Sequence, residues 1–381
     1  MRTRVLLPVL LLLTSVAVAS PGLLSREARV SLLTCAPGDQ LYSLFGHTAI
    51  RVSDPPAGLD VVFNYGTFDF DTPGFYFKFA SGTLLYQLSR VSFPRFMAEY
   101  YYYNRDVREQ VLRLDSLQRQ ALWERLEENY RPEARAYLYN FLYDNCTTRA
   151  RDVIAGAAGG EVTWAPPARD KSFWNLLDEY LEVSPWIQWG IHAILGSPGT
   201  AIATGWEEMF LPDYLMHGVA AAHVDGQLLA SPARVLHEGG EGRRARLPWY
   251  FSPFFVFAAC ATGLVLLLQR YRGKGMLLGV AIPFFVATGM LGCLLVFLGY
   301  FTAHPTTAPN ANLLWANPVN LLVACFIARR RLPPVVRGYL RGYLVLLVVA
   351  LVAWTFLTPA VLLSSLVIIA WMGYLTCRLV R

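Results

Sequence analysis

Acidic residues are absent from the last third of the chain. All 27 Asp and Glu residues lie before position 249, whereas residues 249–381 keep ten Lys or Arg. Residues 20–248 carry 21 basic and 27 acidic side chains, so this part has a formal charge of −6 although the whole chain has +6. Nucleic-acid binding depends on basic side chains that neutralise phosphates. The charge distribution therefore argues against a nucleic-acid partner and assigns the excess positive charge to the tail.

The tail consists of apolar runs separated by short connections. Hydrophobic residues make up 55% of the chain, too many for an ordinary soluble protein of this size. Five runs approach the ~20 residues that a helix needs to cross a bilayer, at 249–268, 276–300, 311–328, 338–357 and 359–377. The connections alternate between basic and uncharged, which by the positive-inside rule places the preceding segment on the outer side. We expect a helical membrane domain of about five transmembrane helices over residues 249–381.

Residues 1–19 have the pattern of a secretory signal peptide. A basic MRTR start precedes a short apolar run, and Ala17-Val18-Ala19 supplies the small residues of a cleavage site. The run is short for a spanning helix, and an uncleaved anchor is the alternative interpretation. Removal of this segment leaves residues 20–246 as one exported domain.

Residues 20–246 combine the patterns of strands and helices, without internal repeats or low-complexity segments. Short β-branched stretches bounded by Gly or Pro predict strands, and Asp115 or Ser116 is expected to cap a helix that ends before Pro132. The predicted strands cover 29–35, 47–53, 60–66 and 106–114, and the predicted helices cover 115–130 and 145–158. The mixture indicates an α+β domain that is large enough for its own hydrophobic core.

Only two cysteines, Cys35 and Cys146, lie in the exported domain; the other four fall in the apolar runs, where cysteine is mostly a small packing residue. An oxidising compartment permits a disulfide between Cys35 and Cys146, which is one interpretation of the pair. The neighbours of Cys146 favour another, because Tyr143-Asp144-Asn145 is typical of a capping turn and puts the thiol in the first turn of a helix. The helix dipole and unpaired N–H groups there stabilise a thiolate and can receive an oxyanion.

His47 is the candidate base for such a nucleophile. It opens a predicted strand directly after Gly46, whose missing side chain lets a substrate or a backbone segment come close. A thiolate nucleophile needs a nearby imidazole that takes up and returns protons. A histidine in a strand more often has a structural role, and it is the helix-start cysteine that favours catalysis here. Because His192, His217 and His223 show no metal-ligand spacing, we expect neither a metal nor another cofactor.

Four segments of the exported domain carry a family resemblance: SLLTCAPGDQLYSLFGHTAIRV, FNYGTFDFDTPGFYFKFASG, FLYDNCTTRARDVI and EEMFLPDYLMHG. A strand histidine followed nearly a hundred residues later by an Asn-Cys helix start resembles the circularly permuted branch of the NlpC-type papain-like superfamily. Together the four segments resemble the Lnb family of lipoprotein N-acyltransferases. The resemblance covers most of residues 28–220 and extends into the tail through HPTTAPNANLLWANP at 304–318. It implies a permuted papain-like (NlpC-type) fold for the exported domain.

The resemblance also implies an activity and a location. Cys146 would take a fatty acyl group from a membrane phospholipid as a thioester, with His47 as the general base. The α-amino group of the diacylglyceryl-cysteine of a lipoprotein would then receive the acyl group. The implied partners are phospholipids and diacylated lipoproteins. The implied location is the bacterial inner membrane, with several membrane passes and the N-terminal domain in the periplasm.

The third catalytic residue and the substrate contacts have alternatives. Asn64, on the next predicted strand, is expected to orient His47, and Asp69 is its competitor. Arg149 follows the nucleophile and is a candidate for binding a phosphate, whereas an ion pair with Asp144 or Asp152 is the more ordinary interpretation. The loop at 301–318 contributes further candidate substrate-binding residues, namely His304, Asn312, Trp315 and Asn317. Polar groups near the membrane edge usually line a cavity or meet another domain, whereas a plain interfacial belt is the alternative.

Two other functions compete with acyl transfer. A membrane-anchored cysteine amidase or peptidase that acts on cell-wall peptides would use the same thiol and imidazole. Five apolar runs argue against it, because a peptidase needs at most a single anchor. The other interpretation is not enzymatic: a Cys35–Cys146 disulfide would staple a binding module of a membrane complex. A free thiol of low pKa at Cys146 separates the enzymatic interpretations from this one.

Overall fold

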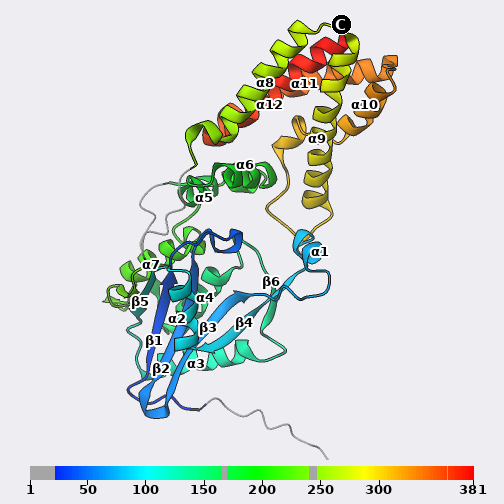
Figure 1. Ribbon diagram of the computed structural model, residues 1–381. Coiled ribbons are helices and arrows are strands. Elements are labelled where there is room, and N and C mark those ends of the chain that lie inside the picture. Colours follow the sequence, from blue (N-terminus) through cyan, green and yellow to red (C-terminus); the bar gives the residue numbers. More distant parts are fainter. Residues whose placement is uncertain (1–21, 165–169, 240–246, 358) are drawn as a thin grey trace, which may run out of the picture.

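The computed structural model describes residues 22–164, 170–239, 247–357 and 359–381. The chain folds into two distinct parts. An α+β domain built on a sheet lies at one end, long helices lie at the other, and the short helices α5 and α6 lie between them (Figure 1). The predicted fold class, a mixed α and β domain followed by membrane helices, is confirmed. The predicted signal peptide, residues 1–19, lies outside the described residues.

The main sheet has seven antiparallel strands in the order β10-β5-β1-β2-β3-β4-β6. Their bounds are β1 Arg29–Cys35, β2 His47–Asp54, β3 Leu59–Thr67, β4 Leu85–Ser92, β5 Val107–Val111, β6 Ala136–Leu138 and β10 Arg234–His237. β1 and β2 pair over the whole of β1, from Arg29 opposite Ser53 to Cys35 opposite His47. The three predicted strands from 29 to 66 agree with β1, β2 and β3 to within one residue at each end. The fourth, predicted at 106–114, is the shorter β5.

Helices cover both faces of this sheet. The helices of the domain are α1 Phe75–Ala80, α2 Phe93–Tyr102, α3 Ser116–Tyr130, α4 Cys146–Ala157, α5 Phe173–Leu181, α6 Pro185–Ile194 and α7 Pro212–Ala221. α3, α4 and α7 pack on one face, and α2 packs on the other. Because successive side chains of a strand point to opposite faces, Ile50 joins the core under α4 while Ala49 joins the core under α2.

A smaller hydrophobic cluster joins α5 to the segments that lead into β2 and α4. Leu44 lies just before β2, Leu142 lies just before α4, and both are buried against Phe173 and Phe210. Burial of one large apolar side chain contributes about 1.5–3 kcal/mol to the stability of the fold. The cluster therefore fixes the beginning of β2 and the beginning of α4 relative to each other.

The described residues contain four segments that are long and apolar enough to cross a membrane: Pro253–Arg270, Lys274–Tyr300, Ala311–Ala328 and Pro334–Val352. The corresponding helices are α8 Pro253–Arg270, α9 Lys274–Tyr300, α10 Val319–Ala328 and α11 Pro334–Leu357. α12, Pro359–Val380, adds a shorter apolar stretch at Ser364–Val380. Each of the five predicted apolar runs corresponds to one of these segments.

The third run differs from the single helix that its composition predicts. Ala311–Leu314 forms a 3-10 turn, η6, and α10 begins only at Val319. The side chain of Asn310 accepts a hydrogen bond from the N–H of Asn312, and asparagine side chains that bond locally compete with helix formation. The ten residues of α10 span only about 15 Å, half of the ~30 Å hydrocarbon core.

α6 connects the α+β domain with the membrane helices. The indole N–H of Trp186 donates to the carbonyl of Phe251 at 2.8 Å, directly before α8. The rings of Trp186 and Trp189 both meet Phe257 edge-on, at centroid distances of 5.4 and 5.3 Å. A helix with two tryptophans thus packs on the membrane domain.

Candidate active site

Cys146 is the first residue of α4, and Asn145 is the N-cap of this helix. The side-chain oxygen of Asn145 accepts from the N–H groups of Thr147 and Thr148, at 2.8 and 2.9 Å. In return, the hydroxyl of Thr148 accepts from the N–H of Asn145 at 2.8 Å, which completes a capping box. The side-chain Nδ2 of Asn145 donates to the carbonyls of Phe141 and Phe210. The nucleophile is therefore held by a fully bonded cap, in the first turn where the sequence predicts it.

His47 is the first residue of β2 and contacts the thiol of Cys146 by a hydrogen bond. Its Nε2 is hydrogen-bonded to the side-chain oxygen of Asn64 on β3. Nδ1 is then the ring nitrogen left for the thiol. Asp69 lies in a turn, where its carboxylate accepts from the N–H of Asp71 at 2.9 Å. The structure thus brings Cys146, His47 and Asn64 together, and of the two candidate orienting residues it is Asn64 that touches the imidazole.

The thiol and the imidazole shift each other's pKa. Burial raises the pKa of Cys146, but the charge of His47 and hydrogen bonds from His47 and Thr147 lower it, with a net result of about 7. Burial lowers the pKa of the His47 imidazole, whereas the Cys146 thiolate and hydrogen bonds to Cys146 and Asn64 raise it above its ordinary value. Both shifts favour a thiolate beside an imidazolium near neutral pH, which is the reactive form of a nucleophilic cysteine.

Tyr139 is a residue of the site that the sequence did not single out. It follows β6, its hydroxyl is hydrogen-bonded to Cys146, and its ring stacks on Tyr86 at a centroid distance of 4.4 Å. Burial and the neighbouring Cys146 raise the pKa of Tyr139 well above its ordinary value, so the phenol keeps its proton and can donate it. The only signal in the sequence is its place seven residues before the cysteine, in YNFLYDNC.

The helix-start N–H groups are less available to an oxyanion than their number suggests. Asn145 already occupies the N–H groups of Thr147 and Thr148. The side chain of Asn145 does not bond the N–H of Cys146, and the hydroxyl of Tyr139 contacts the sulfur, so these two groups are candidate donors to an oxyanion. Reception of an oxyanion in the first turn stays a prediction, and we restrict it to these two groups because the other two N–H groups are bonded to Asn145.

Cys35 and Cys146 are separate thiols. Cys35, at the end of β1, is buried against α2 and hydrogen-bonded to the hydroxyl of Tyr100. Burial raises the pKa of Cys35 to about 12, so this thiol is not a nucleophile at neutral pH. The disulfide-stapled module among the alternative functions required a bond that the structure does not have.

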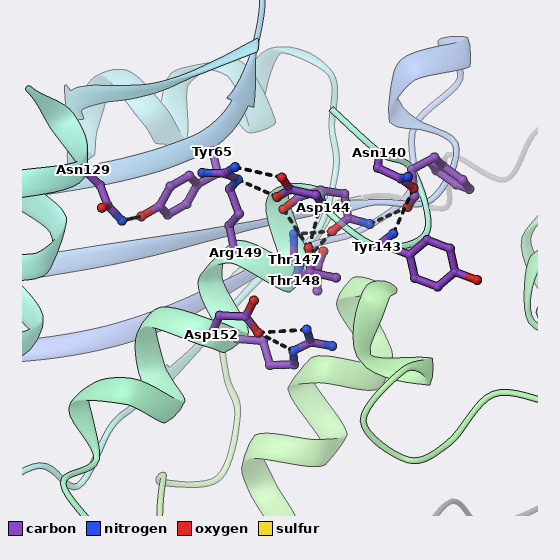
Figure 2. A network of polar contacts seen from close by, with 12 residues as sticks. Tyr65, Asn129, Asn140, Tyr143, Asp144, Thr147, Thr148, Arg149 and Asp152 are labelled. Carbon is purple, nitrogen blue, oxygen red and sulfur yellow. Dashed lines mark hydrogen bonds and ion pairs between the residues drawn. The ribbon is translucent and has the colours of Figure 1, made fainter. Parts of the chain in front are cut away.

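Arg149 supports the turn before the nucleophile. Its Nε and one terminal nitrogen donate to the two carboxylate oxygens of Asp144 at 2.6 and 2.8 Å (Figure 2). Its guanidinium also lies 3.4 Å from the ring centroid of Tyr137. A bidentate pair of this kind is stronger than a single contact and fixes its geometry. The ion pair with Asp144 is thus the interaction present, and binding of a phosphate by Arg149 stays a prediction.

The loop at 301–318 closes the end of α6. The side chain of Asn310 donates to the carbonyl of Ala193 at 2.9 Å, and that of Asn312 donates to the same carbonyl at 3.1 Å. Asn312 also accepts from the indole N–H of buried Trp315 at 2.9 Å. The last carbonyls of a helix have no partner within it, and the two amides supply partners. Asn312 and Trp315 therefore fasten the membrane domain to α6, and a role of theirs in substrate binding stays a prediction.

The two remaining loop candidates lie on either side of these contacts. The Nε2 of His304 donates a hydrogen bond to the carbonyl of Phe79 in α1 at 3.2 Å. Asn317 accepts from the N–H of Val319 at 3.0 Å, where α10 begins. Neither lies in the group formed by Cys146, His47 and Asn64, so their predicted contacts with substrate also stay predictions.

Family comparisons agree with this architecture. The sequence model of the Lnb N-terminal periplasmic domain matches residues 24–177, and that of the Lnb transmembrane domain matches residues 245–380. Comparison with curated proteins and with solved structures gave no match. Residues 24–177 include all of Cys146, His47 and Asn64, and residues 245–380 include the loop that docks on α6. The chain belongs to the Lnb family and is a membrane protein with a periplasmic N-terminal domain.

Proposed function

We propose that the chain is a lipoprotein N-acyltransferase of the bacterial inner membrane. It moves a fatty acyl chain from a membrane phospholipid to the α-amino group of the diacylglyceryl-cysteine of a lipoprotein. The observation that carries the proposal is the contact between the Cys146 thiol and the His47 imidazole at the start of α4, in a chain of the Lnb family. A thiolate with an imidazole partner suits acyl transfer in two steps through a thioester.

In the first step the Cys146 thiolate attacks the ester carbonyl carbon of the phospholipid. A C–S bond forms while the carbonyl electrons move to oxygen, and the oxyanion accepts hydrogen bonds from the Tyr139 hydroxyl and the Cys146 N–H. Collapse of this intermediate breaks the ester C–O bond. The leaving alkoxide takes the proton held by His47, so the products are an acyl thioester and a lysophospholipid.

In the second step the lipoprotein amine attacks the thioester carbonyl. His47, now neutral, takes a proton from the attacking nitrogen. The C–S bond breaks, the amide is released and the thiolate–imidazolium pair is restored. Asn64 acts as a positioning residue, because its bond to Nε2 holds the ring with Nδ1 towards the sulfur.

The membrane helices support the proposal because both substrates are anchored in lipid. A soluble enzyme would have to extract each of them into water, and exposing an acyl chain costs about 0.8 kcal/mol per CH₂ group. Fastening the thiol beside the outer leaflet avoids this cost. A cell-wall peptide, the substrate of the competing amidase interpretation, gives no reason for so many spans.

The test is to trap the acyl-enzyme on the full chain in phospholipid nanodiscs. Intact-mass measurement should find one fatty acyl group on Cys146 that hydroxylamine removes, and Cys146→Ala should carry none. Cys35→Ala is the matched control, since it removes the other exported thiol, and it should still be acylated. In cells, Cys146→Ala should leave lipoprotein N-terminal peptides diacylated. Triacylated peptides at wild-type levels in that variant would refute the proposal, and cleavage of cell-wall peptides without an acyl adduct would favour the amidase.

A further inference from the structure

The connection between β3 and β4, residues 67–85, exposes aromatic side chains to an unusual degree. Tyr76 is 82% exposed and Phe77 is 71% exposed, both on α1, and Phe70 and Phe79 are also exposed. Contiguous exposed apolar surface on a protein usually marks a contact with a partner or a membrane. We call this connection the aromatic hairpin.

The aromatic hairpin is fastened to the outer end of a membrane helix. The N–H of Ala303 donates to the carbonyl of Ser81 at 2.9 Å, and the His304 ring bonds the carbonyl of Phe79. Gly82 has φ +69°, and a Cβ there would meet the carbonyl carbon of Ala303 at 3.1 Å, so another residue would be strained and would press on this backbone. α9 ends at Tyr300, three residues before this contact, and α1 lies against the end of α9 (Figure 1).

The position of α9 sets the level of the hairpin relative to the bilayer. The 27 residues of α9 span about 40 Å, more than the ~30 Å hydrocarbon core, so its end reaches the headgroup region. Tyr300 and Phe301, at this end, are exposed, as expected of aromatics at a membrane interface. The exposed rings of α1 therefore lie at the depth of the lipid headgroups, level with Tyr300 and Phe301.

A continuous row of rings leads from the hairpin to the nucleophile. Centroid distances are 6.3 Å from Phe79 to Phe75, 5.8 Å from Phe75 to Phe68, 5.3 Å from Phe68 to Tyr86 and 4.4 Å from Tyr86 to Tyr139. The last of them, Tyr139, is hydrogen-bonded to Cys146. A chain of ring contacts, three phenylalanines followed by two tyrosines, thus leads from α1 to the sulfur.

The charges of the hairpin argue for apolar rather than electrostatic recognition of lipid. Asp69, Asp71 and Lys78 are the only Asp, Glu, Lys or Arg residues in 67–85, so this segment has a formal charge of −1. Electrostatic attraction to anionic lipid requires a basic cluster, which is missing here. Insertion of the rings into the leaflet should therefore proceed with zwitterionic phospholipid.

From these observations we propose that the aromatic hairpin inserts Tyr76 and Phe77 into the outer leaflet and passes the donor acyl chain along the row of rings to Cys146. The partner is a phospholipid bilayer, and the ligand on the row is a fatty acyl chain. This inference rests on the proposed function for the step at Cys146, whereas insertion of the hairpin does not depend on it.

The first experiment tests insertion alone. The full chain, carrying the photoreactive residue p-benzoylphenylalanine at position 76, is irradiated in phosphatidylcholine nanodiscs, and mass spectrometry locates the adduct. Leu117 at the start of α3 is the matched control position, because it is equally exposed, at 82%. The side chain of its neighbour Gln118 donates to the carbonyl of Ala158, at the end of α4 that lies away from Cys146. A phospholipid adduct at 76 and none at 117 supports the proposal. No adduct at 76, or equal adducts at both positions, overturns it.

The second experiment tests delivery of the acyl chain. Tyr76→Asp with Phe77→Asp should slow thioester formation from nanodisc phospholipid about tenfold or more, because a carboxylate is costly to place among acyl chains. Thioester formation from a water-soluble short-chain acyl thioester should stay within about twofold of wild type, as should both reactions of Leu117→Asp. Equal loss with both donors would overturn the proposal, since the hairpin would then only support the site. If wild type forms no thioester with either donor, the proposed function fails while the cross-linking result stands.

Discussion

Gly66 lies directly against Cys146: a Cβ added to Gly66 would stand 3.3 Å from the Cβ of the cysteine. Gly66 follows Asn64 by two residues on β3, has φ +84° and lies at the irregularity in the pairing of β3 with β4. The missing side chain leaves room for the first turn of α4 beside the end of β3. The sulfur can then meet His47 on the neighbouring strand.

Gly66→Ala should therefore damage the site more than it damages the fold. A left-handed backbone costs a non-glycine residue about 1–2 kcal/mol, and the new methyl group would in addition press on Cys146. Gly58→Ala is the matched control, because Gly58 has φ +62° but no atom within 4 Å of an added Cβ. We expect similar losses of thermal stability in both variants and a loss of acyl-enzyme formation of about tenfold or more in Gly66→Ala alone. Equal activities of the two variants would contradict this account.

The thiol of Cys146 should react with iodoacetamide in a pH profile centred near 7. The rate follows the thiolate fraction, which rises as the pH passes the pKa of about 7. In His47→Ala the largest lowering influence is removed while burial still raises the pKa of Cys146, so labelling at pH 7 should fall about tenfold or more, as the thiolate fraction falls. Peptide mass spectrometry measures both rates. Cys35, with a pKa of about 12, serves as the internal control and should stay unlabelled in the folded protein.

Asn64 and Asp69 can be separated by substitution. Asn64→Ala removes the bond to His47 Nε2 and should slow thioester formation about tenfold or more, since an imidazole free to rotate is a poorer base. Asp69→Ala removes only a local turn contact and should keep nearly the wild-type rate. A pH profile of thiol labelling adds a readout that a purely structural role would leave unchanged. Loss of activity in Asp69→Ala alone would reverse the assignment.

The cap of α4 should contribute more than an ordinary helix cap. Asn145→Ala removes a capping box and also leaves the carbonyls of Phe141 and Phe210 without their amide donor. Loss of a cap costs about 1 kcal/mol, and each unpaired buried group adds about 1–3 kcal/mol. Asp115→Ala removes the equivalent capping box of α3, remote from the thiol, and should cost only the cap. Thermal unfolding and acyl-enzyme formation compare the two; equal stabilities would show that the buried amide contacts contribute little.

The sequence predicted the strands and helices whose patterns are local. Residues 29–35 are β-rich and partly alternating and form β1, and Asp115 supplies a capping signal that needs no tertiary contact. The pairing of Cys146 with His47 could be expected from residue types, because a helix-start thiol needs a base. Their approach itself depends on Gly66, a residue whose importance no local pattern indicates.

The features that the sequence missed depend on tertiary contacts. α1 is a six-residue helix that begins after Gly74 and is held by the distant Ala303. Tyr139 enters the site only because β6 pairs with β4 at the far edge of the sheet. The run at 311–328 has the hydropathy of a spanning helix, yet its asparagines bond to the end of α6 and leave α10 with ten residues. Composition does not distinguish an amide that faces lipid from one that caps another helix.

The loop at 301–318 holds the α+β domain at two separate places, at α1 through Ala303 and at α6 through Asn310. A body held at two separate points can rotate only about the line that joins them, so these contacts restrict how far the sulfur can move relative to the membrane helices. On the proposed function, exchange of donor for acceptor then falls to the substrates. Each lipid must reach the site by lateral diffusion in its leaflet. The residues that follow the modified cysteine of the lipoprotein must be flexible enough for its amine to reach the thioester.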